Sequence, residues 1–427
     1  MEKDIRELYL ENEETGLNDG ELEKGVAEYL TQYQGLKKVL VVPPDFTRCF
    51  SYAGELTRMI YRHLSARGVF VQVMPALGTH MEMDAAEKKA FFADVVPEEA
   101  MLVHHWQTDT IRLGTVPAEF VSEISGGLFS REIEVEVNHL LFDGGFDLIL
   151  SVGQVVPHEV VGMSNYSKNL FVGLGGRGMI NQSHMLGAVC GLENVIGDAD
   201  SPVRALYDYA QRNFLDQKAP VAFLQTVTVQ DGERVIVKGC YMGESRRPYE
   251  KAAALSRKLN ITHLDRPVKR VVAYMDPAEC KSTWISNKAI YRTCRMIADG
   301  GELLVLAPGA ASFGENEEAD AMIRKYGYCG RDKVLKLYEE GAFGNLSMVA
   351  AHLIHGSSNG RYIIRYATDP EKLTEEEVRS VGYEWTDCVE AMRQYGPAVS
   401  REGWNTAADG TEYYFAGKPA AGLWQLG

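Results

Sequence analysis

The feature that most constrains the fold is a regular alternation of short β-branched runs and helical patterns. Residues 38–43 and 69–74 are valine-rich apolar runs, typical of buried strands. Between them, residues 53–67 place apolar side chains at i, i+3, i+4, i+7 and i+8, the spacing of an amphipathic helix. Residues 147–152 form another apolar run. Strand, helix, strand order at this spacing predicts right-handed βαβ units, and hence an α/β fold with mainly parallel sheets.

This alternation of strand and helix patterns is interrupted once and then resumes, which predicts two domains. Residues 219–239 read as a β-hairpin because two β-branched runs flank the turn signal Gln230-Asp-Gly-Glu. The polar segment 260–267 ends in proline and marks the boundary, and the next helix is expected near 287–298. We expect an N-terminal domain at 1–265, a C-terminal α/β domain at 266–397 and a tail at 398–427 that docks on the body, with the active site in the cleft between the two α/β domains.

Charge and cysteine content narrow the class of protein. The 44 basic and 59 acidic residues give a formal net charge of −15, which disfavours nucleic acid as a partner. No run of about 18 apolar residues is present, so we expect no membrane span, and the acidic amino terminus has no secretory pattern. The seven cysteines are scattered without a Cys-x-x-Cys pair, which favours reduced thiols in the cytoplasm.

The densest group of candidate residues lies at 154–184, directly after an expected strand. In open α/β sheets, ligands bind beyond the carboxyl ends of the strands. Four glycines within six residues would let backbone N–H groups approach a phosphate, and Arg177 among them adds a charged donor. The segment matches neither a Walker loop nor a GxGxxG fingerprint, so a flexible turn is the alternative. The four are Gly173, Gly175, Gly176 and Gly178.

Three histidines follow expected strands or loops of this domain. His80 is the last residue of the loop segment that follows the expected strand 69–74. His158 follows a Val-Val-Pro run, and His184 precedes a helical pattern. A lone histidine is more often structural, but three at the carboxyl ends of strands favour function. Imidazole can ligate nickel, copper, zinc or iron, and it can also transfer protons near neutral pH, so both roles are open.

Charged residues complete the candidate site. Arg48 offers a guanidinium fork for a carboxylate, and Asp45 can orient it or hold a ribose hydroxyl. A helix cap with a solvated arginine is the alternative. Lys168 lies just before the glycines, where it could bind an anion or react covalently.

These motifs together resemble the lactate racemase family, the nickel-pincer-nucleotide enzymes. They are Asp-x-Thr-Arg at 45–48, Gly-Thr-His ending at His80, Pro-His-x-x-x-Gly-x-Ser-x-x-x-Lys at 157–168, and the later His184. The resemblance implies a racemase or epimerase that inverts C2 of a 2-hydroxy acid by hydride transfer to the cofactor, through a 2-keto acid. A cofactor supplies a hydride acceptor that side chains lack.

The resemblance also implies partners and roles. The cofactor is a pyridinium-3,5-bisthiocarboxylic acid mononucleotide that carries nickel, the substrate is a small anionic 2-hydroxy acid, and cofactor biosynthesis proteins are expected partners. The implied roles are nickel ligation by His184, acid/base catalysis by His80 and His158, substrate binding by Arg48 and Lys288, and cofactor binding by Asp45, Thr47, Lys168, Gly175, Gly176 and Arg177.

Two departures from the family pattern leave alternatives open. Residues 164–167 read Ser-Asn-Tyr-Ser where the family has Ser-Gly-Gly-x before the lysine, so a cofactor not covalently bonded to Lys168 is an alternative. Trp284 and Ile285 align with a Tyr-Gln pair of lactate racemases, which makes a 2-hydroxy acid other than lactate the expected substrate. A histidine-ligated metallohydrolase, although His-Glu-x-x-His is absent, and a non-catalytic carrier of the nickel cofactor are the alternative functions.

Overall fold

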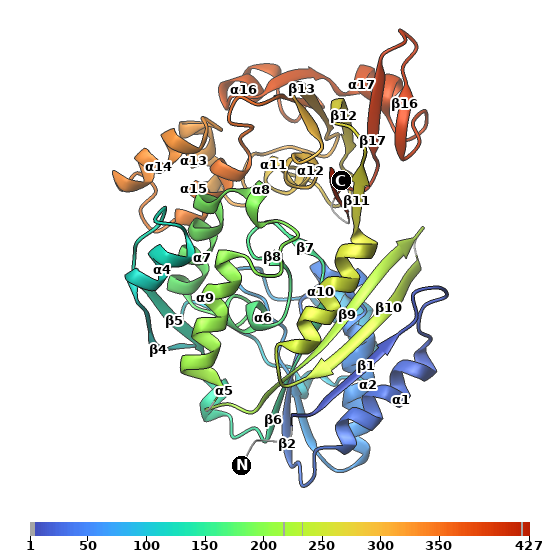
Figure 1. Cartoon of the computed structure of the whole chain (residues 1–427), viewed down its shortest axis with the longest axis vertical. Coiled ribbons are helices and arrows are strands. Elements are labelled where there is room, and N and C mark those ends of the chain that lie inside the picture. Colours follow the sequence, from blue (N-terminus) through green and yellow to red (C-terminus); the bar gives the residue numbers. More distant parts are fainter. Residues whose placement is uncertain (1–4, 217, 233, 420–421) are drawn as a thin grey trace. The chain divides into compact units, whose positions relative to one another are not determined.

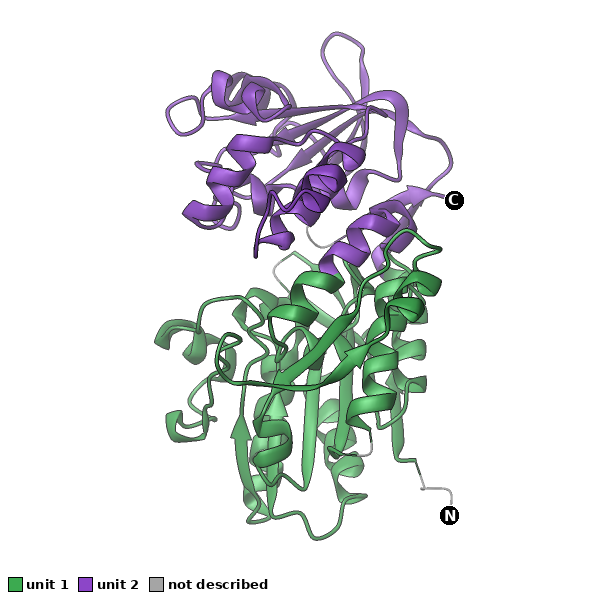
Figure 2. Cartoon of the chain, turned by 90° about the vertical axis from the view of Figure 1, so that its left-hand side faces the viewer, with its two compact units in different colours: residues 1–183, 197–259 green, residues 184–196, 260–427 purple. Residues whose placement is uncertain are grey.

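The computed structural model describes residues 5–216, 218–232, 234–419 and 422–427 (Figure 1). The chain divides into two compact units, the first comprising residues 1–183 and 197–259 and the second residues 184–196 and 260–427 (Figure 2). No described helix has the length and apolar character needed to cross a membrane. The seven cysteines, all within the described ranges, form no disulfide, as the sequence predicts.

The first unit is built on a six-stranded sheet of order β1-β10-β9-β6-β2-β3. Strands β9, β6, β2 and β3 are parallel, β10 pairs antiparallel with β9, and β1 pairs antiparallel with β10. The two-stranded pairs β4–β5 and β7–β8 lie outside it. The strands are β1 Glu7–Glu11, β2 Lys38–Val42, β3 Phe70–Val73, β4 Thr110–Val116, β5 Ile133–Asn138, β6 Leu148–Gln154, β7 Pro157–His158, β8 Gly162–Met163, β9 Val221–Asp231 and β10 Arg234–Gly243.

Helices cover both faces of this sheet, because alternate strand residues are apolar on each side. On one face, apolar residues of α1 and α2 pack with those of β2, β3, β6 and β9 in one buried core. On the other face, Phe223 of β9 contacts Tyr166, which stacks on Tyr249 of α10. The helices are α1 Asp19–Thr31, α2 Ala53–Ala66, α3 Ala85–Phe92, α4 Ala118–Ile124, α5 Leu140–Asp143, α6 Ser167–Phe171, α9 Pro202–Ala210 and α10 Arg247–Asn260, with 3-10 helices Phe46–Ser51 (η1) and Glu98–Ala100 (η2) and the π-helix Gln211–Leu215.

The second unit has its own six-stranded sheet, of order β15-β14-β13-β12-β17-β16. All neighbouring pairs are parallel except β16–β17. The carboxyl-terminal residues contribute β17 next to β12, and β18 pairs with β11. The strands are β11 Ile261–Leu264, β12 Val268–Tyr274, β13 Ile297–Leu306, β14 Ile363–Thr368, β15 Glu384–Asp387, β16 Gly403–Thr406, β17 Glu412–Ala416 and β18 Leu423–Leu426.

Short helices surround the second sheet. Helix α7 begins in the first unit, and its carboxyl-terminal half belongs to the second. The helices are α7 Arg177–Cys190, α8 Leu192–Val195, α11 Thr283–Ser286, α12 Lys288–Thr293, α13 Glu317–Tyr326, α14 Arg331–Glu339, α15 Ser347–His355, α16 Glu375–Ser380 and α17 Cys388–Tyr395.

The α/β class with mainly parallel sheets is confirmed, and so is the hairpin, formed by β9 and β10. Glu233 of its expected turn lies outside the described residues. The helix expected near 287–298 is wrong at its end, because α12 stops at Thr293 and β13 begins at Ile297. Ile297 pairs with Val268 of β12, so strand pairing replaces the last helical turn.

Candidate functional site

The order of the first sheet brings four predicted site residues to one edge. Asp45 follows β2, His80 follows β3, and His158 and Lys168 follow β6. Strands β6, β2 and β3 are adjacent and parallel, so their carboxyl ends share an edge. Ligands of α/β proteins bind at this kind of edge.

Asp45 is the centre of a hydrogen-bonded group at this edge. It caps the 3-10 helix η1, and its Oδ1 accepts hydrogen bonds from the backbone N–H of Thr47 at 3.2 Å and from the Thr47 hydroxyl at 2.5 Å. Its Oδ2 lies 2.5 Å from Nδ1 of His80. Asp45 is buried, whereas the side chain of His80 is 57% exposed. An imidazole that donates Nδ1–H to a carboxylate keeps a lone pair on Nε2, so His80 is oriented to act as a base.

The contacts of Asp45 keep its carboxylate charged. Burial raises the pKa of Asp45, but the hydrogen bond and charge of His80, then the Thr47 hydroxyl and the charge of Arg48, lower it further, so the net pKa is below its ordinary value. An ionised Asp45 stabilises a positive charge on His80 when that ring takes a proton.

Lys168 has an amine that loses its proton unusually easily. It lies on the short helix α6. Burial is the main cause and the charge of Arg48 adds to it, while Glu159 opposes both, and the pKa of Lys168 falls to about 8. Near neutral pH this amine can act as a nucleophile when neutral, or bind an anion when charged.

The loop before Lys168 keeps a backbone conformation that suits glycine. Asn165 has φ 63°, and Tyr166 has φ 56° with ψ −136°, a region that side chains disfavour. The bulk is directed into the interior of the first unit, since the Tyr166 ring packs between Phe223 and Tyr249 at centroid distances of 4.4 and 5.2 Å. The replacement of two family glycines therefore leaves the glycine-type turn in place.

Arg204 fixes the loop that precedes Lys168 by hydrogen bonds. It is fully buried on α9, and its guanidinium donates to the Ser167 hydroxyl at 2.8 Å and to the carbonyls of Met163 and Asn165 at 2.8 and 3.1 Å. Its charge also lies 4.4 Å from the centroid of the Tyr249 ring. Three directed hydrogen bonds to one short loop fix the start of the helix that carries Lys168.

His158 is oriented by the backbone of its own turn. It lies in β7, opposite Gly162 of β8, and is 6% exposed. Its Nδ1 accepts a hydrogen bond from the Val160 N–H at 3.1 Å. The His158 ring is therefore oriented by a hydrogen-bond donor, whereas the His80 ring is oriented by a hydrogen-bond acceptor.

The glycine-rich segment is tightly packed in this structure. A Cβ at Gly175 would lie 1.9 Å from the Phe171 carbonyl oxygen, and one at Gly176 would lie 2.7 Å from the Glu136 carboxylate. That carboxylate accepts the Gly178 N–H at 2.8 Å, at the first turn of α7. These glycines thus have a packing reason, and a phosphate contact at Gly175, Gly176 and Arg177 stays a prediction.

Two further residues surround this segment. The buried ring of His104 contacts the Gly175 carbonyl at 3.2 Å through Nε2 and the Asn138 amide at 3.0 Å through Nδ1. Burial lowers the pKa of His104, which favours the neutral form of the ring and a structural role. Arg177 is exposed, with its guanidinium 5.4 Å from the centroid of the Trp106 ring.

The remaining predicted residues belong to the second unit. His184 lies on α7, seven residues after its first residue, and Lys288 is the first residue of α12. Trp284 on α11 stacks on His352, with the ring centroids 3.9 Å apart and an interplanar angle of 11°. Tyr291 and Tyr328 contact the two ring nitrogens of His352 at 3.0 and 2.9 Å. The Trp284 ring is therefore held in one orientation.

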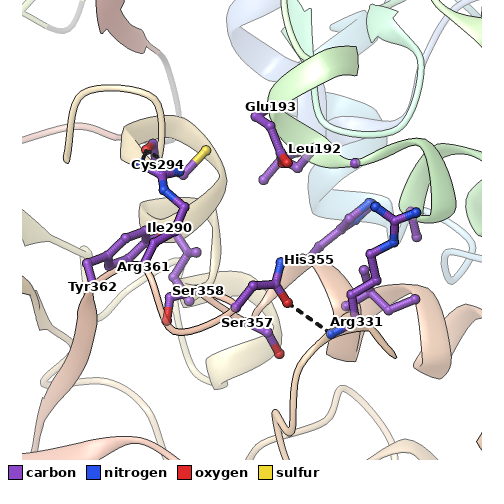
Figure 3. Close-up of a pocket in the computed structure, with 14 residues that line it drawn as sticks. Leu192, Glu193, Ile290, Cys294, Arg331, His355, Ser357, Ser358, Arg361 and Tyr362 are labelled. Carbon is purple, nitrogen blue, oxygen red and sulfur yellow. Dashed lines mark hydrogen bonds between the residues drawn. The ribbon is translucent and has the colours of Figure 1, made fainter. Parts of the chain in front are cut away.

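The second unit also contains a small cavity of about 40 Å³ that none of the predicted site residues lines (Figure 3). Across the described ranges, no group of three or more His, Cys, Asp or Glu side chains is placed to hold a metal ion. The residues around this cavity include Glu193, Cys294, Arg331, His355, Ser357 and Arg361.

Sequence reasoning missed two residues that support the site. Arg204 interrupts the apolar face of α9 that includes Val203 and Tyr207, and a charge at such a position is the one available signal. Glu136 gives no signal, because it occupies an ordinary polar position in the alternation of β5.

Part of the chain matches a known protein family. The family model of the lactate racemase N-terminal domain matches residues 24–194. This stretch includes Asp45, His80, His158 and Lys168. Residues 24–194 therefore match the N-terminal domain of the lactate racemase family. This match supports a function of racemase or epimerase type.

Two solved structures have similar folds. The crystal structure of a protein from Thermotoga maritima is 27% identical, covers 98% of this chain and 100% of that chain, and has a TM-score of 0.83. The lactate racemase apoprotein from Thermoanaerobacterium thermosaccharolyticum is 17% identical, covers 96% of this chain and 89% of that chain, and has a TM-score of 0.69. No curated protein matches the sequence significantly.

Proposed function

We propose that this protein is a racemase or epimerase of the lactate racemase family that inverts C2 of a 2-hydroxy acid with a nickel-pincer nucleotide. The observation that carries the proposal is the Asp45–His80 pair at the sheet edge that also bears Lys168. The charged carboxylate of Asp45 supports His80 as a base, and the amine of Lys168 loses its proton easily. This combination suits proton transfer beside an anionic cofactor.

The residues present fit such a cofactor. A pincer brings sulfur and carbon ligands of its own and would need one imidazole from the chain. The lowered pKa of Lys168 reflects a buried cation beside Arg48, an arrangement that an anionic group would stabilise. His184 would hold the nickel, and Lys168 would bind the cofactor covalently or as a cation. When bound, the cofactor supplies the acceptor for the C2 hydride.

The chain's own residues supply binding and proton transfer. Arg48 and Lys288 hold the substrate carboxylate, since guanidinium and ammonium groups recognise it by charge. Nε2 of His80 takes the hydroxyl proton as the 2-keto acid forms, and Asp45 stabilises the resulting imidazolium. His158, on the opposite side of the substrate, would return a proton to the oxygen once the keto group has turned.

The substrate is a 2-hydroxy acid other than lactate. Trp284 stands where lactate racemases are aligned to carry tyrosine, and its stacking on His352 offers a fixed aromatic surface. Burial lowers the pKa of His352 to about 3, so its ring is neutral and adds no charge there. An aryl, sugar or dicarboxylic 2-hydroxy acid would use such a surface better than a methyl group does.

The test compares variants of protein produced with the cofactor-building proteins. We expect nickel and a visible chromophore in the wild type, loss of nickel in His184→Ala, and retained nickel with lost turnover in His80→Ala. Zinc in place of nickel would favour the metallohydrolase, and nickel without turnover on any 2-hydroxy acid would favour the carrier. Full activity of His184→Ala would refute its assignment as the nickel ligand.

A further inference from the structure

His352 is contacted on one face and at both ring nitrogens in the interior of the second unit. It is buried on α15, and its ring lies parallel to the Trp284 indole at a centroid distance of 3.9 Å. Nδ1 lies 3.0 Å from the Tyr291 hydroxyl, and Nε2 lies 2.9 Å from the Tyr328 hydroxyl. The ring therefore cannot turn without losing at least one of these contacts.

The two tyrosine hydroxyls suit a neutral imidazole. A neutral ring has one nitrogen that donates and one that accepts, and a hydroxyl group can do either. Burial lowers the pKa of His352 to about 3, so the ring stays neutral across the physiological pH range. Tyr291 and Tyr328 are buried as well, so the hydroxyls and the ring hold one another in place.

A buried asparagine extends this network toward the helix that carries Trp284. Asn287 is fully buried where α11 ends and α12 begins, and its amide nitrogen lies 3.3 Å from Nε2 of His352. Its side-chain oxygen accepts a hydrogen bond from the Tyr366 hydroxyl at 2.6 Å. His352 is thus joined to α11 twice, by the stacked indole and by the residue that follows this helix.

Trp284 differs from the network behind it because it is only half-buried. Part of this residue is accessible to a ligand, whereas His352 and Asn287 have almost no exposed surface. Stacking requires a defined ring plane, and an indole that is held before binding loses less conformational freedom when a ligand arrives. The network therefore prepares an aromatic surface without touching the ligand itself.

We propose that His352 is a positioning residue that holds the Trp284 ring in one plane and thereby selects 2-hydroxy acids with a flat, aromatic side chain. This inference rests on the proposed function, in which Trp284 contacts the substrate side chain. An aromatic side chain gains most from a fixed indole, and the methyl group of lactate gains least. Loss of His352 should therefore reduce selectivity between substrates more than turnover in general.

Fluorine NMR tests the positioning without catalysis. The full chain is labelled with 5-fluorotryptophan, and Trp284→Phe identifies one of the five tryptophan signals by its loss. His352→Gln can still contact the tyrosine hydroxyls but has no ring, so we expect the Trp284 signal to lose the ring-current shift of the imidazole. The other four signals should stay in place, which shows that the variant folds. A Trp284 signal unchanged by His352→Gln would overturn the proposal.

The flat-ringed variant His352→Phe provides the matched comparison. It keeps a ring beside Trp284 but offers nothing to the tyrosine hydroxyls. We expect it to retain a ring-current shift at Trp284, with a broader signal than in the wild type because the ring is no longer held at its edges. A signal as narrow as that of the wild type would show that stacking alone fixes the indole and would contradict the role of the two nitrogens.

Kinetics test the effect on selectivity. Values of kcat/KM are measured for 3-phenyllactate and for lactate. We expect His352→Gln to lower the ratio of the two values about tenfold, mainly through a higher KM for 3-phenyllactate, with kcat/KM for lactate within about threefold of wild type. His105→Gln, at an exposed position of the first unit, should leave the ratio unchanged.

Three results would contradict the selectivity role. These are an unchanged ratio in His352→Gln, an equal loss on both substrates, and a wild type that inverts 2-hydroxy acids but none with an aromatic side chain. If the wild type inverts no 2-hydroxy acid at all, the proposed function fails and the selectivity role fails with it. The fluorine signals still decide, in that case, whether His352 fixes the Trp284 ring.

Discussion

Nδ1 of His80 lies 2.5 Å from Oδ2 of Asp45, and this contact joins the carboxyl ends of two adjacent parallel strands, β3 and β2. Because the carboxylate orients the ring and stabilises its protonated form, Asp45→Asn should lower kcat by about 10²- to 10⁴-fold with little change in KM. Steady-state rates on the substrate that the wild type inverts measure this.

A matched control exists outside the site. Asp109 makes a similar contact with the exposed ring of His105, at 2.9 Å from its Nδ1. We expect Asp109→Asn to keep kcat within twofold of wild type. Comparable losses in both variants would mean that any His–Asp pair near this sheet matters only for folding.

The same carboxylate should contribute a pH-dependent part of the stability. The pKa of Asp45 in the folded chain is lowered, mainly by His80 acting against burial. A lowered pKa gives stability that is present above the unfolded pKa of about 4 and is lost as pH falls through the folded pKa. The difference in unfolding free energy between wild type and Asp45→Asn should therefore shrink below about pH 4. A difference that grows on acidification would contradict the assignment.

Arg48 should contribute to the lowered pKa of Lys168. Burial and the charge of Arg48 together lower the pKa of Lys168 to about 8, so removal of that charge in Arg48→Gln should raise it. Titration of ¹³C-methylated lysines by NMR follows this amine, with Lys168→Met identifying its signal. Arg62→Gln, an exposed change on α2, is the control and should leave the midpoint unchanged. An unaltered midpoint in Arg48→Gln would place the cause in burial alone.

Buried Arg204 should dominate the stability of the loop that precedes Lys168. Arg204→Leu removes three hydrogen bonds to this loop and leaves its acceptors unpaired, so we expect a loss of about 3–5 kcal/mol in unfolding free energy. Arg62→Leu, at an exposed position, should change it by less than about 0.5 kcal/mol. Urea unfolding measures both, and similar small effects would show that the loop does not depend on Arg204.

Much of the first unit could be predicted from sequence, because its signals are local. The apolar runs at β2, β3 and β6 and the periodicity of α2 are properties of short segments. The candidate residues Asp45, His80 and His158 were found because each follows such a strand. Their convergence on one edge also depends on the strand order β6-β2-β3, which only long-range pairing decides.

Other features could not be read from the sequence. The end of α12 is set by pairing of Ile297 with Val268, a contact between distant residues. The sequence at 164–167 suggests a bulky loop, but the structure keeps positive φ at Asn165 and Tyr166 by burying the tyrosine ring. The hydrogen bond to Nδ1 of His158 comes from one backbone N–H, that of Val160, and no residue type signals it.

The most direct test of the central claim follows the C2 hydrogen during inversion. Single enantiomers of 2-hydroxy acids carrying deuterium at C2 are incubated with nickel-loaded protein in ordinary water. The opposite enantiomer is then separated, and its deuterium content is measured by mass spectrometry. Hydride transfer predicts inversion with deuterium retained at C2, because the hydride does not exchange with solvent. Inversion with deuterium washed out would mean proton abstraction at carbon, and no inversion of any 2-hydroxy acid would contradict the proposed function.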